Sequence, residues 1–381
     1  MNFLKVLSLT LFVTLLTVSL PVLPTRALTE KDLSAPAAVL MDAATGTVLF
    51  EKNAHEVRAC ASITKVMTLL LVMEALDNGQ LQWDDTITTS AHAASMGGSD
   101  IWLEPGETMT VEEMVKATIV ASANDAAVAL AEAVSGTEEA FVAEMNRKAQ
   151  QLHMEETVFK NCNGLDEDGH VTSAYDVALM SRALLQHPSI LTYSGIWMDE
   201  LRDGKTQLVN TNKLLKSYDG ITGLKTGTTS QAGSCVSATA ERDGLSLVAV
   251  VLGCATSKER FRDAADLLDY GFAHYTLLLP TVPPEALRAI PVKNGMLSSV
   301  GTDCQIQERI LVPKGQDSTL QPTVYLPETL EAPVEQGEVI GRVVYQNGSD
   351  RMAEYPITAD ASVEAVNFND VMGLFLRSLS G

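Results

Sequence analysis

The stretch that decides the fold is Ser62-Ile-Thr-Lys65-Val-Met-Thr-Leu-Leu-Leu-Val-Met-Glu-Ala75, where a polar beginning runs into an apolar segment. The apolar residues recur at helical spacing and leave almost no polar face. We therefore expect a helix over residues 62–75 that is buried at the centre of a domain, and the Asn78-Gly79 pair ends it. On this helix Ser62 and Lys65 share a face one turn apart, so the lysine amine can reach the serine hydroxyl.

The segments around this helix predict a mixed domain. Before it, residues 38–41 and 48–50 predict two strands around a turn at residues 42–46. After it, further helices are predicted from the capping box Thr110-Val-Glu-Glu113, over 124–134 with Asn124 or Asp125 as the cap, and over 138–152, 174–185 and 259–275. Three antiparallel strands are predicted at 223–229, 234–241 and 245–252, with a hairpin turn at Arg242-Asp243-Gly244. Strands at both ends and helices between them indicate an α/β (α+β) layered domain.

The chain of 381 residues is longer than one typical domain. A Pro-rich boundary at residues 280–284 closes a first domain over residues 28–280. Beyond it, short apolar strands and turns predict a small all-β domain over residues 281–362. A last helical stretch at residues 363–381 has its apolar side chains on one face.

The N-terminus predicts export. Lys5 precedes an apolar run at residues 6–20, Pro21 and Pro24 break any helix, and Thr25-Arg26-Ala27 offers a cleavage site. We expect a secretory signal peptide over residues 1–27; the alternative is an uncleaved membrane anchor. Either way the working part lies outside the cytoplasm.

Charge and cysteine content narrow the chemistry. The net charge of −21 argues against a nucleic-acid partner. The five cysteines have no metal-like spacing, their pairing stays open, and at least one thiol is free in a monomer. Cys60 lies two residues before Ser62 and is interpreted as a packing residue. The six histidines are scattered, so no metal or other cofactor is expected, and His92 and His170 are read as surface or loop residues.

Lys65 can activate Ser62 only as the neutral amine. Holding a lysine neutral at pH 7 costs ~4.6 kcal/mol against its ordinary pKa. Burial in an apolar helix and a second nearby cation both reduce that cost, and Lys225 is our candidate for this cation. The alternative is that Ser62 caps the helix and Lys65 is a surface lysine.

Two further motifs follow in order. Ser122-Ala-Asn124 lies in a short break between apolar helices, where the hydroxyl can relay a proton and the amide can bind a peptide carbonyl; the alternative is that both residues only cap a helix. Lys225-Thr-Gly227 lies on a predicted strand. There Lys225 and Thr226 can hold a carboxylate, and Gly227 lets an extended ligand pair with the strand. The backbone N–H groups of Thr228 and Ser62 can form an oxyanion hole. The alternative is an edge strand with a solvated lysine.

The ordered set of S-x-x-K, S-x-N and K-T-G resembles the serine D-alanyl-D-alanine carboxypeptidases, the low-molecular-mass penicillin-binding proteins of the DacF/DacA type. The resemblance extends to Ala38-Val-Leu-Met-Asp-Ala-Ala-Thr-Gly46, Leu103-Glu-Pro-Gly106 and Gly164-Leu-Asp166, and covers residues 36 to 275 closely. It implies a transpeptidase/β-lactamase-like domain with a small C-terminal β domain, and peptidoglycan stem peptides ending in D-Ala-D-Ala as substrate. β-Lactam antibiotics would be covalent inhibitors.

The resemblance also implies roles for individual residues. Ser62 would form the acyl-enzyme, Lys65 would activate it, and Ser122 and Asn124 would serve proton transfer and substrate binding. The substrate would be held by Lys225, Thr226, Gly227, Thr228 and Arg260, although Arg262 lies close to the position of Arg260.

The resemblance further implies a C-terminal helix that attaches to the membrane surface. That stretch carries one cation, Arg377, against Glu364 and Asp370, whereas interfacial helices usually add positive charge. A helix packed on protein is the alternative. Two rival functions stay open, a serine β-lactamase and a catalytically inactive wall-binding scaffold on the same fold.

Overall fold

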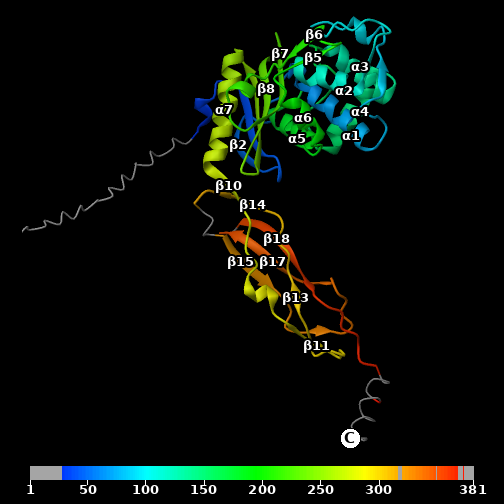
Figure 1. The fold of residues 1–381 in the computed structure, drawn as a ribbon. Helices are drawn as coiled ribbons and strands as arrows, with labels where there is room; N and C mark the ends of the chain where they lie inside the picture. The colour runs from blue at the N-terminus through cyan, green and yellow to red at the C-terminus, as the bar shows by residue number, and fades with distance from the viewer. Residues whose placement is uncertain (1–27, 316–319, 349, 368–371, 373–381) are drawn as a thin grey trace, which may run out of the picture.

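The computed structural model describes residues 28–315, 320–348, 350–367 and 372. Its first domain is built on one five-stranded antiparallel sheet with the strand order β2-β1-β9-β8-β7 (Figure 1). The strands are β1 (Ala37–Asp42), β2 (Val48–Lys52), β7 (Ile221–Thr229), β8 (Gly233–Arg242) and β9 (Leu245–Cys254). The five strands predicted for this domain are therefore confirmed, and β7, which carries the K-T-G motif, lies at one end of the sheet order.

Helices cover both faces of this sheet. α7 (Ser257–His274) contacts β8 and β9 on one face, and α5 (Ala174–Leu184) contacts β1 and β9 on the other. Beyond α5 lies a helical cluster with α1 (Lys65–Asp77) at its centre (Figure 1). Its other members are α2 (Val111–Lys116), α3 (Asn124–Ser135), α4 (Glu138–Gln151) and α6 (Ser189–Ser194). The mixed α/β class with an antiparallel sheet is thus confirmed.

The central helix begins later than predicted. α1 spans Lys65–Asp77, and the preceding 3-10 turn η2 (Ala61–Thr64) carries Ser62. Ala61 has the left-handed φ of +51°, which an α-helix does not allow, so the chain reaches α1 through a tight turn. Burial of α1 is as expected, since ten of its thirteen residues are buried.

Helix starts further along the chain were predicted with mixed success. The capping box at Thr110 is present in full, with the Thr110 hydroxyl and the Glu113 carboxylate each bonded to the other residue's backbone N–H. The cap predicted for α3 is wrong, because Ala123 occupies that position and no side chain caps the helix. Asn124 and Asp125 lie in its first turn, and their side chains bond elsewhere, as described below.

Two short hairpins and several single turns complete this domain. The hairpins pair β3 (Thr86–Thr88) with β4 (Thr108–Thr110), and β5 (Met198–Leu201) with β6 (Thr206–Val209). The turns are η1 (Glu30–Asp32), η3 (Ala93–Ser95), the π-helical η4 (Ala117–Ala121) and η5 (Lys213–Lys216).

The C-terminal part is a narrow β domain that projects from the first domain (Figure 1). Its main sheet has the order β13-β18-β17-β15, and a smaller one has the order β12-β11-β16. The elements are η6 (Pro284–Leu287), β11 (Ile290–Lys293), β12 (Ser299–Val300), β13 (Thr302–Asp303), β15 (Leu320–Tyr325), β16 (Leu330–Glu331), β17 (Val339–Asn347) and β18 (Asp350–Ala359). Two separate apolar clusters form its core.

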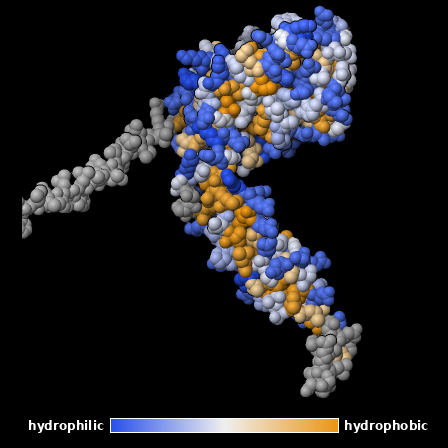
Figure 2. All heavy atoms as spheres, in the orientation of Figure 1, coloured by the Kyte–Doolittle hydropathy of each residue, from blue (hydrophilic) through white to orange (hydrophobic). Residues whose placement is uncertain are grey.

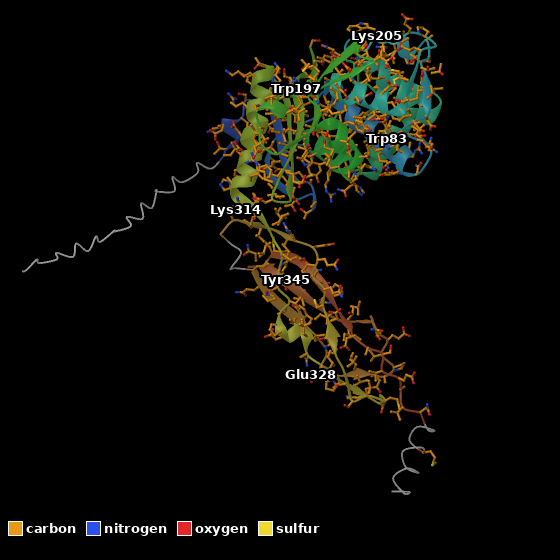
Figure 3. The ribbon with its side chains drawn as sticks, viewed as in Figure 1. Trp83, Trp197, Lys205, Lys314, Glu328 and Tyr345 are labelled. Atoms are coloured by element: carbon orange, nitrogen blue, oxygen red, sulfur yellow. The ribbon has the colours of Figure 1, made fainter. Side chains whose placement is uncertain are left out.

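A small sheet joins the two domains. β10 (Tyr275–Leu278) pairs with β14 (Ile310–Pro313). At this junction Lys314 donates from Nζ to the carbonyl oxygen of Phe272 at 2.6 Å (Figure 3). Leu311 packs into the core between the first domain's sheet and α7.

The surface of the β domain is rich in apolar residues (Figure 2). Its exposed large apolar side chains are Leu287, Met296, Leu297, Tyr325, Val339, Val366 and Met372.

Both predicted terminal segments lie largely outside the described residues. The predicted signal peptide falls entirely on residues 1–27, and most of the predicted C-terminal helix falls on residues 368–371 and 373–381. Its first residues are extended instead, since Val363 and Ala365 form β-bridges with Val334 and Gly295. Within the described part of the chain, no helix is both long and apolar enough to cross a bilayer.

Candidate active site

Ser62 and Lys65 meet as the spacing predicts. Lys65 donates from Nζ to the Ser62 hydroxyl at 3.1 Å, to Asn124 Oδ1 at 2.5 Å and to the backbone carbonyl of Asn163 at 2.6 Å. The Lys65 side chain is fully buried, whereas Ser62 stays partly accessible. This geometry excludes the surface-lysine alternative, and Ser62 does not cap α1.

Burial changes the chemistry of Lys65. Desolvation of the ammonium lowers the pKa of Lys65 to about 7, while the carboxylates of Asp100 and Asp125 oppose the shift. A substantial share of Lys65 is therefore neutral near pH 7, with its nitrogen next to the Ser62 hydroxyl. That pairing of a buried amine with a hydroxyl is what a serine nucleophile activated by lysine requires.

A second serine–lysine pair, Ser122 and Lys225, lies near the pair of Ser62 and Lys65. Lys225, on β7, is almost completely buried and donates from Nζ to Ser122 Oγ at 2.8 Å and to the carbonyl of Thr226 at 3.0 Å. The alternative of a solvated edge-strand lysine is thus excluded. The three motifs, far apart in the sequence, converge on one place.

Lys225 was expected to be the second cation that lowers the pKa of Lys65, but burial of the Lys65 ammonium lowers that pKa instead. Burial, followed by the charges of Lys65 and Arg260, in turn lowers the pKa of Lys225 well below its ordinary value.

A strained turn presents Ser122. The π-helical turn η4 ends at Ser122, which has left-handed angles of φ 64° and ψ 30°. Such a conformation costs about 1–2 kcal/mol outside glycine. The turn directs Ser122 Oγ toward Lys225 rather than toward the start of α3.

Asn124 and Asp125 anchor the loop at residues 97–103, which forms one wall of the site. The Asn124 amide donates from Nδ2 to the Gly97 carbonyl at 2.6 Å, while its Oδ1 accepts from Lys65. The buried Asp125 carboxylate accepts from the backbone N–H groups of Ile101 and Leu103. The pair therefore fixes the loop at residues 97–103, and Asn124 positions the Lys65 amine.

β7 supplies the opposite wall. A Cβ atom on Gly227 would lie 2.7 Å from the Cys60 carbonyl oxygen and 2.9 Å from the Ser62 nitrogen, so only glycine lets this strand approach the nucleophile. The Thr226 hydroxyl donates to Thr211 Oγ1 at 2.6 Å. Thr228 is exposed beside the site.

The structure distinguishes between the two candidate arginines. Arg260 donates from Nη1 to the Gly227 carbonyl at 2.9 Å and to Thr228 Oγ1 at 2.8 Å, and its Nε is buried with no hydrogen-bond partner. Arg262 is half exposed and pairs with Asp263. Of the two arginines, Arg260 is therefore the one that contacts β7.

Sequence reasoning missed two contributors to the site. Asn163 acts through its backbone carbonyl and Thr211 through its hydroxyl, and neither residue belongs to a motif. His170 lies in a loop, as one of the two predicted settings, but it is buried and hydrogen-bonds Thr64 behind Ser62. All five cysteines, including Cys60, are free and buried, and burial raises the pKa of Cys60 to about 12.

Comparison with known sequences agrees with this geometry. The family described as D-alanyl-D-alanine carboxypeptidase matches residues 24–256, and the C-terminal domain of penicillin-binding protein 5 matches residues 285–365. The D-alanyl-D-alanine carboxypeptidase DacF of Bacillus subtilis is 42% identical over 88% of this chain and 87% of its own. DacC of Escherichia coli is 33% identical over 91% and 89%.

Solved structures are similar as well. Penicillin-binding protein 5 from Haemophilus influenzae superimposes with a TM-score of 0.75 at 30% identity, over 87% of this chain and 98% of that one. Penicillin-binding protein D2 from Listeria monocytogenes, in an ampicillin-bound form, has a TM-score of 0.55 at 36% identity, over 63% of this chain and 98% of its own. By sequence and by fold, this chain belongs to the D-alanyl-D-alanine carboxypeptidase family.

Proposed function

We propose that Ser62 is the nucleophile of this carboxypeptidase and that it carries the acyl-enzyme. The observation that supports the proposal best is the buried Lys65 amine 3.1 Å from the Ser62 hydroxyl, with its pKa lowered to about 7. Ser62 Oγ attacks the carbonyl carbon of the penultimate D-alanine while Lys65 takes the hydroxyl proton. The C–N bond to the terminal D-alanine then breaks, and a water molecule later hydrolyses the ester.

The Ser122–Lys225 pair is proposed to return a proton to the leaving amine. Their 2.8 Å hydrogen bond joins the Ser122 hydroxyl directly to the amine of Lys225. The Ser122 hydroxyl can pass a proton to the departing nitrogen and recover one from Lys225. Asn124 holds Lys65 in place, and the N–H groups of Ser62 and Thr228 remain our candidates for the oxyanion hole.

Substrate is proposed to bind along β7. This strand ends the sheet order, so an extended stem peptide can add to it as a further strand. Lys225, Thr226 and Arg260 are the candidates for holding the terminal carboxylate. Arrival of that negative charge raises the pKa of Lys225 and favours its ammonium form, which makes a charge-assisted bond.

The same nucleophile is proposed to react with β-lactams, whose strained amide takes the place of the D-Ala-D-Ala bond. The relative from Listeria with bound ampicillin supports this inference. The expected physiological role is trimming of peptidoglycan stem peptides during cell-wall maturation.

We also propose that the protein acts outside the cytoplasm, after export through residues 1–27. The C-terminal stretch, which follows the β domain, is our candidate for contact with a membrane surface. The exposed Met296, Leu297 and Val366 lie beside its first residues, since Met296 N–H donates to the Glu364 carbonyl and Val366 N–H to the Asn294 carbonyl. Flotation with anionic vesicles, before and after removal of residues 368–381, tests this contact. Equal flotation of both forms would exclude the segment as the anchor.

Release of D-alanine from a diacyl-D-Ala-D-Ala peptide tests the catalytic proposal. The wild type and the control Ser217→Ala, which removes an exposed hydroxyl, should release D-alanine, and Ser62→Ala should not. Undiminished release by Ser62→Ala would exclude Ser62 as nucleophile. No release by the wild type would favour an inactive scaffold.

A second measurement separates the carboxypeptidase from a β-lactamase. Labelled penicillin should leave a long-lived adduct on this protein. Rapid turnover of the antibiotic without a lasting adduct would favour a β-lactamase.

A further inference from the structure

A hydrogen-bonded chain runs behind the nucleophile and ends on the residue that precedes it. His170 Nε2 lies 2.7 Å from Thr64 Oγ1, and Thr64 Oγ1 donates to the Ala61 carbonyl at 2.9 Å. Thr64 is completely buried and His170 is almost completely so. Neither side chain hydrogen-bonds Ser62 or Lys65, and the mechanism above uses neither of them.

The hydrogen bond between His170 and Thr64 can have only one donor. The backbone N–H of Lys160 donates to His170 Nδ1 at 3.1 Å, so Nδ1 is the unprotonated nitrogen and Nε2 carries the hydrogen. Nε2–H therefore donates to Thr64 Oγ1, and the Thr64 hydroxyl donates to the Ala61 carbonyl, while Cys60 Sγ lies 3.5 Å from Thr64 Oγ1. Burial lowers the pKa of His170 to about 4, which agrees with this neutral tautomer.

The hydrogen-bonded chain ends on Ala61, whose backbone is strained. Ala61 has a φ of +51°, a left-handed conformation that alanine adopts rarely. Gly164 packs directly on it, since a Cβ atom at Gly164 would lie 2.0 Å from the Ala61 carbonyl oxygen and 2.8 Å from the Ser62 nitrogen. The orientation of the Ala61 peptide sets where the Ser62 N–H and hydroxyl point, so a bond to its carbonyl constrains the nucleophile.

We propose that Thr64 and His170 are positioning residues for Ser62, which hold the Ala61 carbonyl so that the Ser62 hydroxyl faces Lys65 and its N–H is oriented for the proposed oxyanion hole. The inference rests on the proposed role of Ser62 in acylation. It predicts that breaking the chain slows acylation itself and leaves the initial binding of the acylating ligand unchanged.

Two matched pairs of variants test the chain in the full protein. Thr64→Val keeps the volume and removes the hydroxyl, whereas Thr64→Ser keeps it. His170→Gln can place an amide donor where Nε2 lies, whereas His170→Asn can keep only the acceptor for Lys160. Stopped-flow kinetics with a chromogenic β-lactam give the acylation rate constant and the dissociation constant separately, and thermal unfolding checks that each variant is folded.

We expect Thr64→Val and His170→Asn to acylate about ten-fold more slowly, with an unchanged dissociation constant, and Thr64→Ser and His170→Gln to stay near wild type. A purely structural role would lower the unfolding temperature, without a slower acylation step at an unchanged dissociation constant and without recovery in Thr64→Ser or His170→Gln. Wild-type rates in folded Thr64→Val, or equal losses in both members of a pair, would overturn the proposal. If Thr64→Val does not fold, the His170 pair decides. If the wild type itself is not acylated, both the proposed function and this positioning role are overturned. If the wild type is acylated and a folded Thr64→Val variant reacts at the same rate, only the positioning role is overturned.

Discussion

At the scale of the residue, the amine of Lys65 sets the pH dependence of acylation. Only its neutral form can accept the Ser62 proton, and burial lowers its pKa to about 7. The second-order acylation constant with a β-lactam should therefore fall as pH decreases through about 7 and level off above it, because that constant reports groups of the free enzyme. A profile from about pH 5 to pH 11 checks this. An acidic limb centred near the ordinary lysine pKa of about 10.4 would contradict the proposed base.

Lys225 leads to a second prediction at this scale. Burial of the Lys65 ammonium, rather than the charge of Lys225, lowers the pKa of Lys65. Lys225→Ala should therefore leave the acidic limb where it is and weaken binding of D-Ala-D-Ala peptides about 10–100-fold, through the lost bond to the carboxylate.

The control for this prediction is Lys213→Ala, which removes an exposed lysine near the site and should change neither quantity. An upward shift of the limb in Lys225→Ala would show instead that Lys225 stabilises the neutral form of Lys65. Weakened binding by the Lys213 variant would point to a general effect of surface charge.

The sequence identifies the residues that act through side chains in motifs, and it misses those that act through the backbone or through packing. Lys65 and Ser62 are predictable because helical spacing places them on one face. The carbonyl of Asn163 reaches Lys65 only after the chain has folded. The role of His170 depends on Thr64 and Lys160, with which it shares no motif.

At the scale of the element, two tight turns, rather than regular helices, position the two serines of the proposed site. The 3-10 turn η2 carries Ser62, and the π-helical turn η4 ends at Ser122. The spacing of apolar residues predicts the middle of each helix well, because the residues of a buried helix face recur at helical spacing in the sequence. It does not predict where α1 and α3 begin, because contacts from Gly164, Gly227 and the loop at residues 97–103 decide those positions.

A pair of glycine variants tests the contact behind η2. Gly164 and Gly106 have φ values of +85° and +87°, so alanine meets the same backbone strain at both. At Gly106 no atom lies within 4 Å of the new Cβ, whereas at Gly164 it would overlap the Ala61 carbonyl. We expect Gly106→Ala to cost about 1–2 kcal/mol of unfolding free energy and to keep acylation.

Gly164→Ala should cost several kcal/mol more, on the order of the largest single-site effects, and should lose acylation. Urea unfolding and penicillin labelling measure both quantities. Equal losses of stability in the two variants would mean that η2 can move away from Gly164, and the account of a tightly packed nucleophile turn would fail.

At the scale of the whole molecule, the proposed catalytic groups all belong to the first domain. Lys65, Ser122, Lys225 and Arg260 make their hydrogen bonds within it, and the β domain joins it through β10, β14 and Lys314. The Listeria relative aligns over nearly its whole length with only 63% of this chain. We expect residues 28–280 to fold and to acylate at a rate close to that of the full chain.

Some stability should be lost on this truncation, because Leu311 no longer packs against the first domain. Labelled penicillin and thermal unfolding of the two forms make the comparison. A drop in acylation of ten-fold or more, in a truncated protein that is folded, would mean that the β domain shapes the site. The sequence predicts the boundary itself at a Pro-rich stretch, where helical patterns are followed by strand patterns. It does not predict the small sheet across the junction, because β10 and β14 are separated by more than thirty residues.

The most direct test of the central claim is to locate the adduct. The full-length protein is incubated with penicillin, digested, and its modified peptide sequenced by mass spectrometry. We predict one penicilloyl group per chain, attached to Ser62, with no adduct on Ser62→Ala. An adduct on another residue, or one that persists in Ser62→Ala, would contradict the claim that Ser62 is the nucleophile.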